Sequence, residues 1–291
     1  MEDYMVKVIT ESKDIIGVAC ISTNLVNDAR IRHGTSPTAT AALGRALTGA
    51  GLMASLLDPD QRVALKFQGD GPLKKIVVEA DGTGAVRGYA GAPEVDLPPK
   101  NGKLDVSGAL GRQGYLTVSK DLRLKDVYTG VVHLHSGEIA SDIAYYLTES
   151  EQIPSAVGLG VFVERDATVS AAGGFLVQSL PPSDEKRIEA LAQRIEHMDS
   201  VTSQIREGKL PEDMLKTIFE GIPYHVIERR QLAFRCACSR ERTEQAIIAL
   251  GPEEIRSIIA GHETLEISCQ FCGQVRSFSR EELQRLIGEK H

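Results

Sequence analysis

Two pairs of cysteines near the end of the chain constrain its fold more than any other feature. The first pair is Cys236-Ala237-Cys238 and the second is Cys269-Gln270-Phe271-Cys272, so four of the five cysteines lie in the last fifth of 291 residues. Two thiol pairs separated by enough chain for a small fold can surround one ion, and zinc prefers four thiolates in a tetrahedron. Each pair is also close enough to form a disulfide. The cysteines therefore predict a zinc site or two disulfides, depending on redox conditions.

The module that carries these cysteines, residues 232–291, is small. A chain of about 60 residues is near the limit at which an apolar core alone holds a fold, whereas zinc on thiolates supplies on the order of 10 kcal/mol of apparent folding free energy. The sequence predicts helices from Arg240 to Leu250 and from Pro252 to Ile259, a strand pair around Cys269 to Phe278, and a last helix from near Ser279. We expect oxidation of the thiols to release zinc and unfold this module.

Three arginines, Arg235, Arg240 and Arg242, flank the first cysteine pair. Four thiolates around a zinc ion carry a net charge of about −2, and nearby cations favour that state. We expect these side chains to offset the charge of the site. Four protein ligands leave no open position for water, so the site predicts a structural or sensing role and not hydrolysis.

The rest of the chain predicts an α+β domain over residues 1–180 and a helical connector over residues 181–231. Short apolar runs between glycine turns predict strands, and helical spacing of apolar residues predicts helices. The strands include Arg62 to Phe67, Lys74 to Glu79 and Tyr115 to Val118, and the helices include Ser36 to Leu57 and Glu138 to Leu147. Consecutive strands joined by turns short enough for hairpins predict an antiparallel or mixed sheet.

The connector is predicted from two amphipathic segments that follow Pro181-Pro182. Leu191, Ile195 and Met198 recur at helical spacing in the first, and the second begins at Pro211. Their apolar faces predict packing against the α+β domain.

Composition limits the classes of partner. Hydrophobic residues make up 42% of the chain and charged residues 25%, as in an ordinary soluble globular protein. The net charge of −7 does not attract nucleic acid, and the C-terminal module, with eight basic and nine acidic residues, has no basic stripe. The N-terminus lacks a secretory signal, and no apolar run approaches the roughly 20 residues of a membrane span. We expect a cytoplasmic protein that binds neither nucleic acid nor membrane.

Other motifs are weaker. Gly82-x-Gly84-x-x-x-Gly88 fits a hairpin better than a dinucleotide loop, and no phosphate-binding loop is present, so no nucleotide is expected. His133 and His135 with Glu138 suggest a metal site, but no further ligand is evident and a solvated sheet face is favoured. Cys20 lies in an apolar run and is predicted to be a small buried hydrophobe. No nucleophile, base and orienting group come together, so we predict no catalytic residue and no enzyme.

A set of motifs spread over nearly the whole chain resembles those of one known family. The most specific are Phe234 to Arg242 and Cys269 to Gly273. The supporting motifs are Gln68 to Pro72, Tyr128 to Val132, Ser150 to Pro154 and Ala171 to Gln178. The chain is similar in these motifs to the bacterial 33-kDa heat-shock protein family of redox-regulated holdase chaperones.

The resemblance implies that Cys236, Cys238, Cys269 and Cys272 hold one zinc ion per chain in a reduced, inactive form. It also implies that peroxide or hypochlorous acid, together with heat or another unfolding stress, joins Cys236 to Cys238 and Cys269 to Cys272. Zinc then leaves, the connector loosens, homodimers form, and unfolding client proteins are held without ATP.

Apolar residues of the connector are the candidate client surface. They are Leu191, Ile195, Met198, Val201, Ile205, Met214 and Leu215. A switch requires that they are packed in the reduced state and available in the oxidised state.

Two other functions stay open on the residues alone. A structural zinc ribbon in a nucleic-acid-binding or interaction protein would use the same four cysteines. A thiol–disulfide oxidoreductase would use Cys269-x-x-Cys272, but such motifs open a helix in a thioredoxin-like pattern, whereas this one follows a predicted strand and ends in Gly273.

Overall fold

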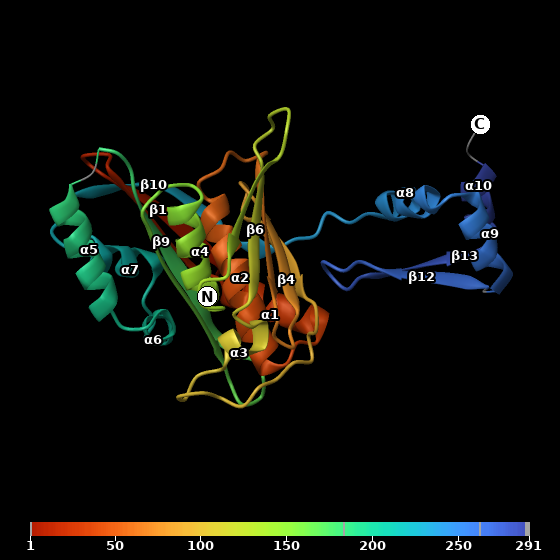
Figure 1. Ribbon diagram of the computed structural model, residues 1–291, viewed down its shortest axis with the longest axis horizontal. Coiled ribbons are helices and arrows are strands. Elements are labelled where there is room, and N and C mark those ends of the chain that lie inside the picture. The colour runs from red at the N-terminus through yellow and green to blue at the C-terminus, as the bar shows by residue number, and fades with distance from the viewer. Residues whose placement is uncertain (1, 183, 262, 289–291) are drawn as a thin grey trace. The chain divides into compact units, whose positions relative to one another are not determined.

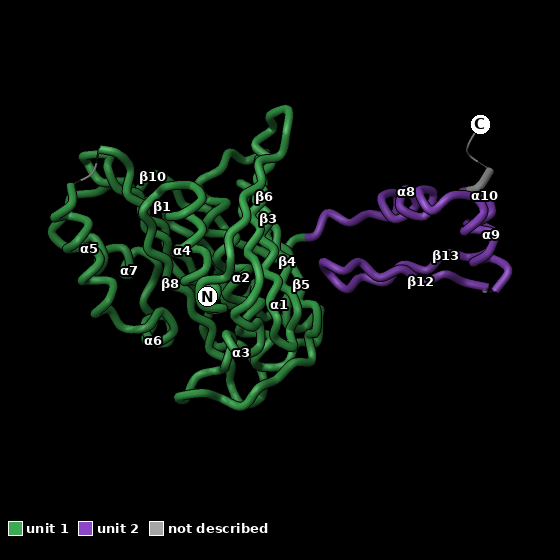
Figure 2. The backbone as a smooth tube through the Cα atoms, viewed as in Figure 1, with its two compact units in different colours: residues 1–235 green, residues 236–291 purple. Residues whose placement is uncertain are grey.

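The computed structural model describes residues 2–182, 184–261 and 263–288. This part of the chain forms two compact units, unit 1 (residues 1–235) and unit 2 (residues 236–291), as Figure 2 shows. None of its helices is both long enough and apolar enough to cross a membrane.

Unit 1 contains two β-sheets. The strands of the first sheet are β1 (Tyr4–Thr10), β2 (Ile15–Ile21), β8 (Ser155–Val163), β9 (Val169–Ser179) and β10 (Tyr224–Gln231), in the order β10-β1-β2-β9-β8. The strands of the second are β3 (Arg62–Gly69), β4 (Lys75–Asp81), β5 (Ala85–Ala90), β6 (Gly114–Asp121), β7 (Tyr128–His133) and β11 (Ala233–Phe234), in the order β11-β5-β4-β3-β6-β7. The first sheet is antiparallel and the second is mixed, because β11 runs parallel to β5. The predicted α+β class is confirmed.

Three helices lie between the sheets: α1 (Thr23–His33), α2 (Pro37–Ala54) and α4 (Ile139–Glu149) (Figure 1). α2 begins at Pro37 because proline suits a first turn and because Oγ of Ser36 accepts a hydrogen bond from the N–H of Ala39. It contacts strands of both sheets, and each of its residues except Pro37 and Arg45 is buried. Alanine, glycine and threonine dominate its sequence, and these small side chains let the helix fit between two sheets.

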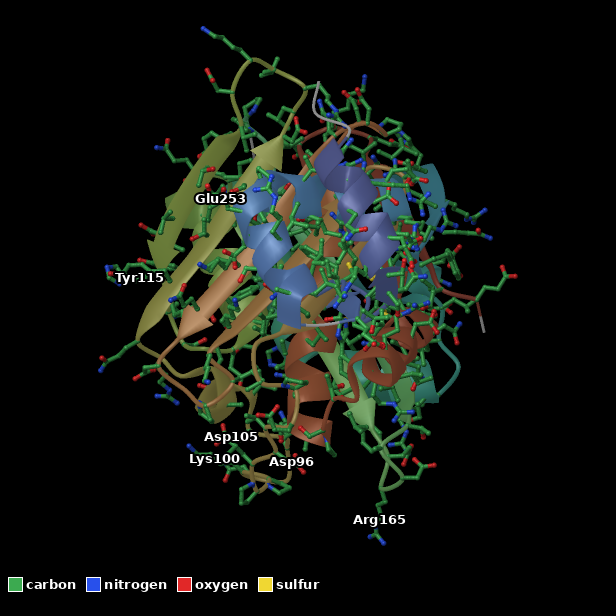
Figure 3. All side chains as sticks on the ribbon, turned by 90° about the vertical axis from the view of Figure 1, so that its right-hand side faces the viewer. Asp96, Lys100, Asp105, Tyr115, Arg165 and Glu253 are labelled. Atoms are coloured by element: carbon green, nitrogen blue, oxygen red, sulfur yellow. The ribbon has the colours of Figure 1, made fainter. Side chains whose placement is uncertain are left out.

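The loop between β5 and α3 (Val106–Leu110) secures two helix ends. Asp96 accepts a hydrogen bond from the N–H of Thr38 at 3.1 Å, and Asp105 caps α3 by accepting from the N–H of Gly108 at 2.8 Å. Figure 3 shows both carboxylates with Lys100 on this loop.

The segment predicted to be a connector covers the outer face of the first sheet within unit 1. Its helices α5 (Glu185–His197), α6 (Val201–Arg206) and α7 (Pro211–Ile218) lie on that side (Figure 1). Its last residues form β10, which pairs with β1. The sequence does not predict β10, because Glu228, Arg229 and Arg230 interrupt its apolar residues.

Two glycines of the first sheet let the connector lie directly on the strands. A Cβ atom on Gly17 would lie 2.4 Å from Cε2 of Phe219, and one on Gly173 would lie 2.6 Å from Cδ1 of Ile205. Both neighbours belong to the connector and are buried. A larger residue at Gly17 would therefore push the connector away from the sheet, whereas a Cβ atom on Gly173 would also lie 2.4 Å from the carbonyl oxygen of Cys20 on β2.

Unit 2 combines helices with one hairpin. Its elements are α8 (Arg240–Leu250), α9 (Pro252–Gly261), β12 (Thr264–Ser268), β13 (Val275–Ser279) and α10 (Arg280–Gly288). The order of helices and paired strands agrees with the prediction. Its described core is small and consists of Ile247, Ile255, Phe278, Leu283 and Leu286. The fold of unit 2 therefore has little apolar burial to stabilise it.

Candidate metal centre

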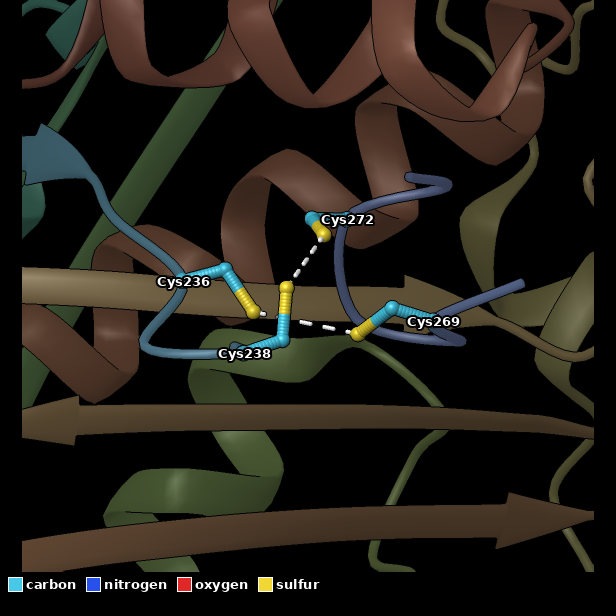
Figure 4. Close-up of side chains that lie close together, drawn as sticks. All are labelled: Cys236, Cys238, Cys269 and Cys272. Carbon is cyan, nitrogen blue, oxygen red and sulfur yellow. Dashed lines mark hydrogen bonds between the residues drawn. The ribbon is translucent and has the colours of Figure 1, made fainter. Parts of the chain in front are cut away.

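The four predicted cysteine ligands come together in unit 2 (Figure 4). Cys236 and Cys238 precede α8, and Cys269 and Cys272 lie in the turn between β12 and β13. Their Sγ atoms all lie within 4.8 Å of one another. Sγ of Cys238 lies 3.4 Å from Sγ of Cys272, and Sγ of Cys236 lies 3.8 Å from Sγ of Cys269. Each of these contacts joins one pair to the other.

These spacings fit a tetrahedral metal site. With metal–sulfur bonds of about 2.3 Å, as in zinc sites, the sulfurs of a tetrahedron stand about 3.8 Å apart. The cross-pair distances of 3.4 and 3.8 Å are close to this value, whereas the two sulfurs of a disulfide are about 2.05 Å apart. The cluster could therefore bind a metal ion.

Backbone hydrogen bonds shape the second half of the site. The N–H of Cys269 donates to the carbonyl of Gln274 at 2.9 Å, and the N–H of Gly273 donates to the carbonyl of Cys269 at 2.8 Å. Gly273 has a φ of +71°, which glycine adopts without steric cost. The tight turn after Cys272 brings this part of the chain back toward Cys269, as the glycine after the motif predicts.

Arg276 on β13 is a neighbour of the site that the sequence did not point to. One nitrogen of its guanidinium lies 3.2 Å from the carbonyl oxygen of Cys238, to which it donates, and 3.9 Å from Sγ of the same residue. Of the expected arginines, Arg242 donates to the carbonyl of Ala237 at 3.1 Å. Arg276 was missed because it approaches Cys238 through the fold of the hairpin and not through nearness in the chain.

Arg240 stabilises the core of unit 2. Its guanidinium lies over the ring of Phe278, with 4.5 Å from its central carbon to the ring centroid. It also forms ion pairs with Glu244 at 3.2 Å and with Glu282 at 2.6 Å. These contacts satisfy its charge with carboxylates and place it over the core.

Burial opposes ionisation of the second cysteine pair. Burial raises the pKa of Cys272 to about 12, and contacts with the other three thiols raise it as well. Burial also raises the pKa of Cys269. A bound cation would reverse this effect, because metal binding favours thiolates and releases their protons. The affinity of the cluster for a metal should therefore fall as the pH falls.

The chain just before the cysteines is fixed to unit 1 by a segment that we call the anchor, Leu232–Arg235. The N–H of Leu232 donates to the carbonyl of Asp3 at 3.0 Å, and β11 then pairs with β5. The ring of Phe234 is 7% exposed and lies under the guanidinium of Arg32, with 5.0 Å from the guanidinium carbon to the ring centroid. Unit 1 therefore holds the chain up to the residue before Cys236.

The candidate client-binding residues lie in one apolar cluster on the outer face of the first sheet. Leu191, Val201, Ile205, Met214 and Leu215 are buried there, and Ile195 and Met198 are half-buried beside them. They pack with strand residues that include Val6, Val8, Ile15, Ala19, Phe175 and Val177. The packed connector therefore hides its own apolar face and an apolar face of the sheet.

The remaining motifs lie outside this site. Cys20 is fully buried in β2, and burial raises the pKa of its thiol. The ring of His133 lies 4.7 Å from that of the exposed Tyr115 (Figure 3), and His135 stacks on Tyr145 at 5.1 Å. Within the described residues, the metal-type cluster consists of the four cysteines and does not include these histidines.

Two sheets around a helical layer, followed by a small unit, define an α+β protein with a four-thiol cluster that could bind a metal ion. The model of the Hsp33 protein family matches residues 3–279. The chain therefore belongs to the Hsp33 family.

Individual relatives match this chain over nearly their full length. The 33 kDa chaperonin of Geobacter sulfurreducens is 56% identical, and the match covers 98% of this chain and 94% of the relative. The 33 kDa chaperonin of Geobacter sp. strain M21 is 49% identical over 99% of this chain and 98% of the relative. The crystal structure of the 33 kDa chaperonin (HSP33) of Thermotoga maritima has a TM-score of 0.93 and 35% identity, and covers 100% of this chain and 99% of that one. Membership makes the chain a chaperone that acts on client proteins, and not an enzyme.

Proposed function

We propose that the protein is a redox-regulated, ATP-independent holdase of the cytoplasm. In the reduced, inactive form Cys236, Cys238, Cys269 and Cys272 bind one zinc ion. Oxidation joins Cys236 to Cys238 and Cys269 to Cys272 and releases the zinc. The connector, residues 181–231, then loosens between the α+β domain, residues 1–180, and the redox-switch domain, residues 232–291. The chain forms homodimers and holds unfolding proteins under oxidative and heat stress.

The main support for the proposal is that four thiols cluster in a unit whose apolar core is small. The described core of unit 2 rests on a few side chains such as Ile247, Phe278 and Leu283. Bound zinc would keep the sulfurs as thiolates and contribute on the order of 10 kcal/mol to the folding of this unit. Oxidation would remove that contribution, so the cluster is suited to convert a redox signal into unfolding.

Peroxide would serve as the oxidant that forms each disulfide. One thiolate of a pair attacks a peroxide oxygen, the O–O bond breaks, and a sulfenic acid and hydroxide form. The second thiolate attacks that sulfur, the S–O bond breaks, and a second hydroxide leaves as the disulfide forms. Each pair of thiolates thus gives two electrons to one peroxide as its disulfide forms. The guanidinium of Arg276 lies 3.9 Å from Sγ of Cys238, so a positive charge stands beside one of the reacting sulfurs.

Release of the connector would supply the client surface. Leu191, Ile195, Met198, Val201, Ile205, Met214 and Leu215 would become available together with the strand residues that they cover. A contiguous apolar area of this kind is suited to hold unfolded chains. Along the chain, the anchor and β10 separate the cysteines from α7. The state of unit 2 would therefore reach the connector through these two segments.

The deciding experiment measures light scattering of a heat-unfolding client while a chelating dye reports zinc release. The reduced chain should leave aggregation unchanged, and the chain treated with peroxide at elevated temperature should release zinc and suppress aggregation. Equal protection in both states contradicts the switch. Zinc release without client protection leaves a structural module and contradicts the holdase.

The pairing of the disulfides needs its own test, because the close sulfur contacts in the reduced fold run between the pairs. Peptide mapping of the oxidised protein should show Cys236 linked to Cys238 and Cys269 linked to Cys272. A bond between Cys238 and Cys272, whose sulfurs lie 3.4 Å apart, would contradict this pairing.

A further inference from the structure

The two halves of the metal centre are held in different ways. Cys236 and Cys238 lie in a segment between β11 and α8 that forms neither helix nor strand, whereas Cys269 and Cys272 lie in the turn of a hairpin (Figure 4). Backbone hydrogen bonds of that turn hold the second half. The first half therefore depends more on side chains to keep its sulfurs in place.

One side chain of the hairpin, that of Arg276, connects the two halves. Its Nη2 donates to the carbonyl oxygen of Cys238 at 3.2 Å and to Oε1 of Gln274 at 3.2 Å, and it lies 3.9 Å from Sγ of Cys238. A terminal guanidinium nitrogen carries two protons, and the two carbonyl oxygens take them. The contact between Arg276 and the sulfur is therefore mainly electrostatic.

The charge of Arg276 is available to the sulfur. Arg240 on α8 forms ion pairs with two glutamates, whereas Arg276 forms no ion pair among the residues that the structure describes. As a thiol, Cys238 donates to Oε1 of Gln274 at 3.6 Å. A metal-bound thiolate has no proton to donate and is attracted by the guanidinium instead.

Cys238 and its neighbour across the pairs, Cys272, differ in how they are shielded. Cys272 is 5% exposed, whereas Cys238 is half-buried, so an oxidant reaches Cys238 more easily. A thiolate bound to a metal is already deprotonated, so a positive charge beside it changes only how readily the sulfur gives up electrons. A stabilised thiolate is a weaker nucleophile. The charge of Arg276 would therefore slow the attack of Cys238 on an oxidant.

We propose that Arg276 is a positioning residue of the metal centre that strengthens metal binding and restrains the reaction of Cys238 with oxidants. This inference rests on the proposed function, in which the four cysteines bind zinc when reduced. The hydrogen bond to the carbonyl of Cys238 fixes the first half of the site against the hairpin, and the charge offsets part of the negative charge of the thiolates. In the restrained step the sulfur gives two electrons to peroxide, the O–O bond breaks, and a sulfenic acid and hydroxide form.

The test compares the reduced full-length chain with three variants. Arg276→Gln removes the charge and Arg276→Lys keeps it. Arg242→Gln is the matched control, since Arg242 donates to the carbonyl of Ala237 at 3.1 Å in the same segment. Competition with a chelating dye should show a zinc affinity about tenfold lower in Arg276→Gln, because loss of a partner of a metal ligand costs about 10-fold to 100-fold. Arg276→Lys should recover part of this loss, and Arg242→Gln should change the affinity little.

A second measurement separates the effect of charge from a loosening of the fold. At a zinc concentration that saturates every variant, iodoacetamide labels a small part of the chains, and mass spectrometry locates the first label. In this reaction a thiolate attacks carbon, a C–S bond forms and iodide leaves. The share of first labels on Cys238 should rise in Arg276→Gln, because the restraint on that sulfur is removed. General loosening of unit 2 would expose the four thiols alike.

The outcomes separate this role from the proposed switch. An affinity and a label distribution in Arg276→Gln that match those of Arg242→Gln overturn the role of Arg276, as does a rise in labelling of the four cysteines alike. Absence of any recovery in Arg276→Lys overturns the role of the charge. A wild type that binds no zinc contradicts the proposed function and this inference together. A wild type that binds zinc without protecting clients contradicts the holdase alone, because both measurements are made without client and without peroxide.

Discussion

The connector and unit 2 are held by different forces, and this difference explains why a switch of this kind would respond to two conditions together. Met214, Leu215 and Phe219 of the connector are at most 1% exposed against a sheet, and apolar burial does not depend on redox state. Unit 2 combines a small core with four clustered thiols that could bind a metal ion, and metal binding by thiols does depend on redox state. In the proposed switch an oxidant would therefore act directly on unit 2, whereas release of the connector would also need heat or another stress that weakens packing.

The largest expected effect tests the dependence of unit 2 on its cysteines. Replacing Cys269 and Cys272 with serine should abolish stoichiometric zinc and unfold unit 2 while unit 1 stays folded, because about 10 kcal/mol of metal-linked folding energy is lost. Chelator-dye titration gives the zinc content, and NMR gives the fold of each unit. Cys20→Ala, a change of a buried cysteine in unit 1, should keep full zinc. Retained zinc in the double variant would show that the ligands are misassigned.

The next effect tests the anchor between the two regions. Phe234→Ala removes a buried ring from beneath Arg32, and such truncations cost about 4 kcal/mol. The anchor should loosen, and client protection should appear at a lower oxidant concentration and temperature than in the wild type. Tyr115→Ala, which removes an aromatic ring that is 50% exposed in the same unit, is the control. An unchanged activation threshold would contradict a role of the anchor in coupling.

A smaller effect tests whether packing alone restrains the connector. Gly17→Leu should push Phe219 away from the sheet, because even a Cβ atom would lie 2.4 Å from its ring, and overpacking of this kind costs up to about 3 kcal/mol. The reduced, zinc-loaded variant should then protect clients without oxidant. Adding Phe219→Ala makes room for the new side chain and should restore oxidant dependence in part. A reduced Gly17→Leu variant that is folded but inactive would show that the connector does not cover the client surface.

The smallest effect uses pH to separate the two regions. Burial raises the pKa of Asp3 to about 6, above its unfolded value of about 3.9. The folded state therefore favours the protonated carboxyl group of Asp3. The stability that this protonation contributes is complete below about pH 4 and is lost as the pH rises through about 6. Asp3→Asn should remove it, so the stability of the variant relative to the wild type should rise by roughly 2 kcal/mol over this range.

Chemical unfolding of unit 1 at several pH values measures this difference, with Glu2→Gln as the charge-matched control. A stability difference between wild type and Asp3→Asn that does not vary with pH would contradict the buried-acid assignment. The stability of metal-bound unit 2 should instead fall as the pH falls, because acid protonates thiolates and releases metal.

Much of the fold could be predicted from the sequence where the signal is local. The helix at Pro37 follows from a serine cap and a run of small apolar residues, and the helices and hairpin of unit 2 follow from short periodic segments. The strand β10 could not be predicted, because Glu228 and Arg230 become acceptable there only through ion pairs, Lys7 with Glu228 and Arg230 with Glu228.

The candidate site also has features that the sequence predicts and features that only the folded structure shows. The sequence by itself determined which four residues could share an ion, because the spacing of Cys236, Cys238, Cys269 and Cys272 limits which sulfur atoms can meet. Only the tertiary structure decided that the close sulfur contacts run between the pairs, that Arg276 reaches Cys238, and that Gly17 lies beneath Phe219. The physical reason is that cysteine spacing acts over a few residues of chain, whereas burial and charge pairing arise between segments that are distant in sequence and become neighbours only when the chain folds.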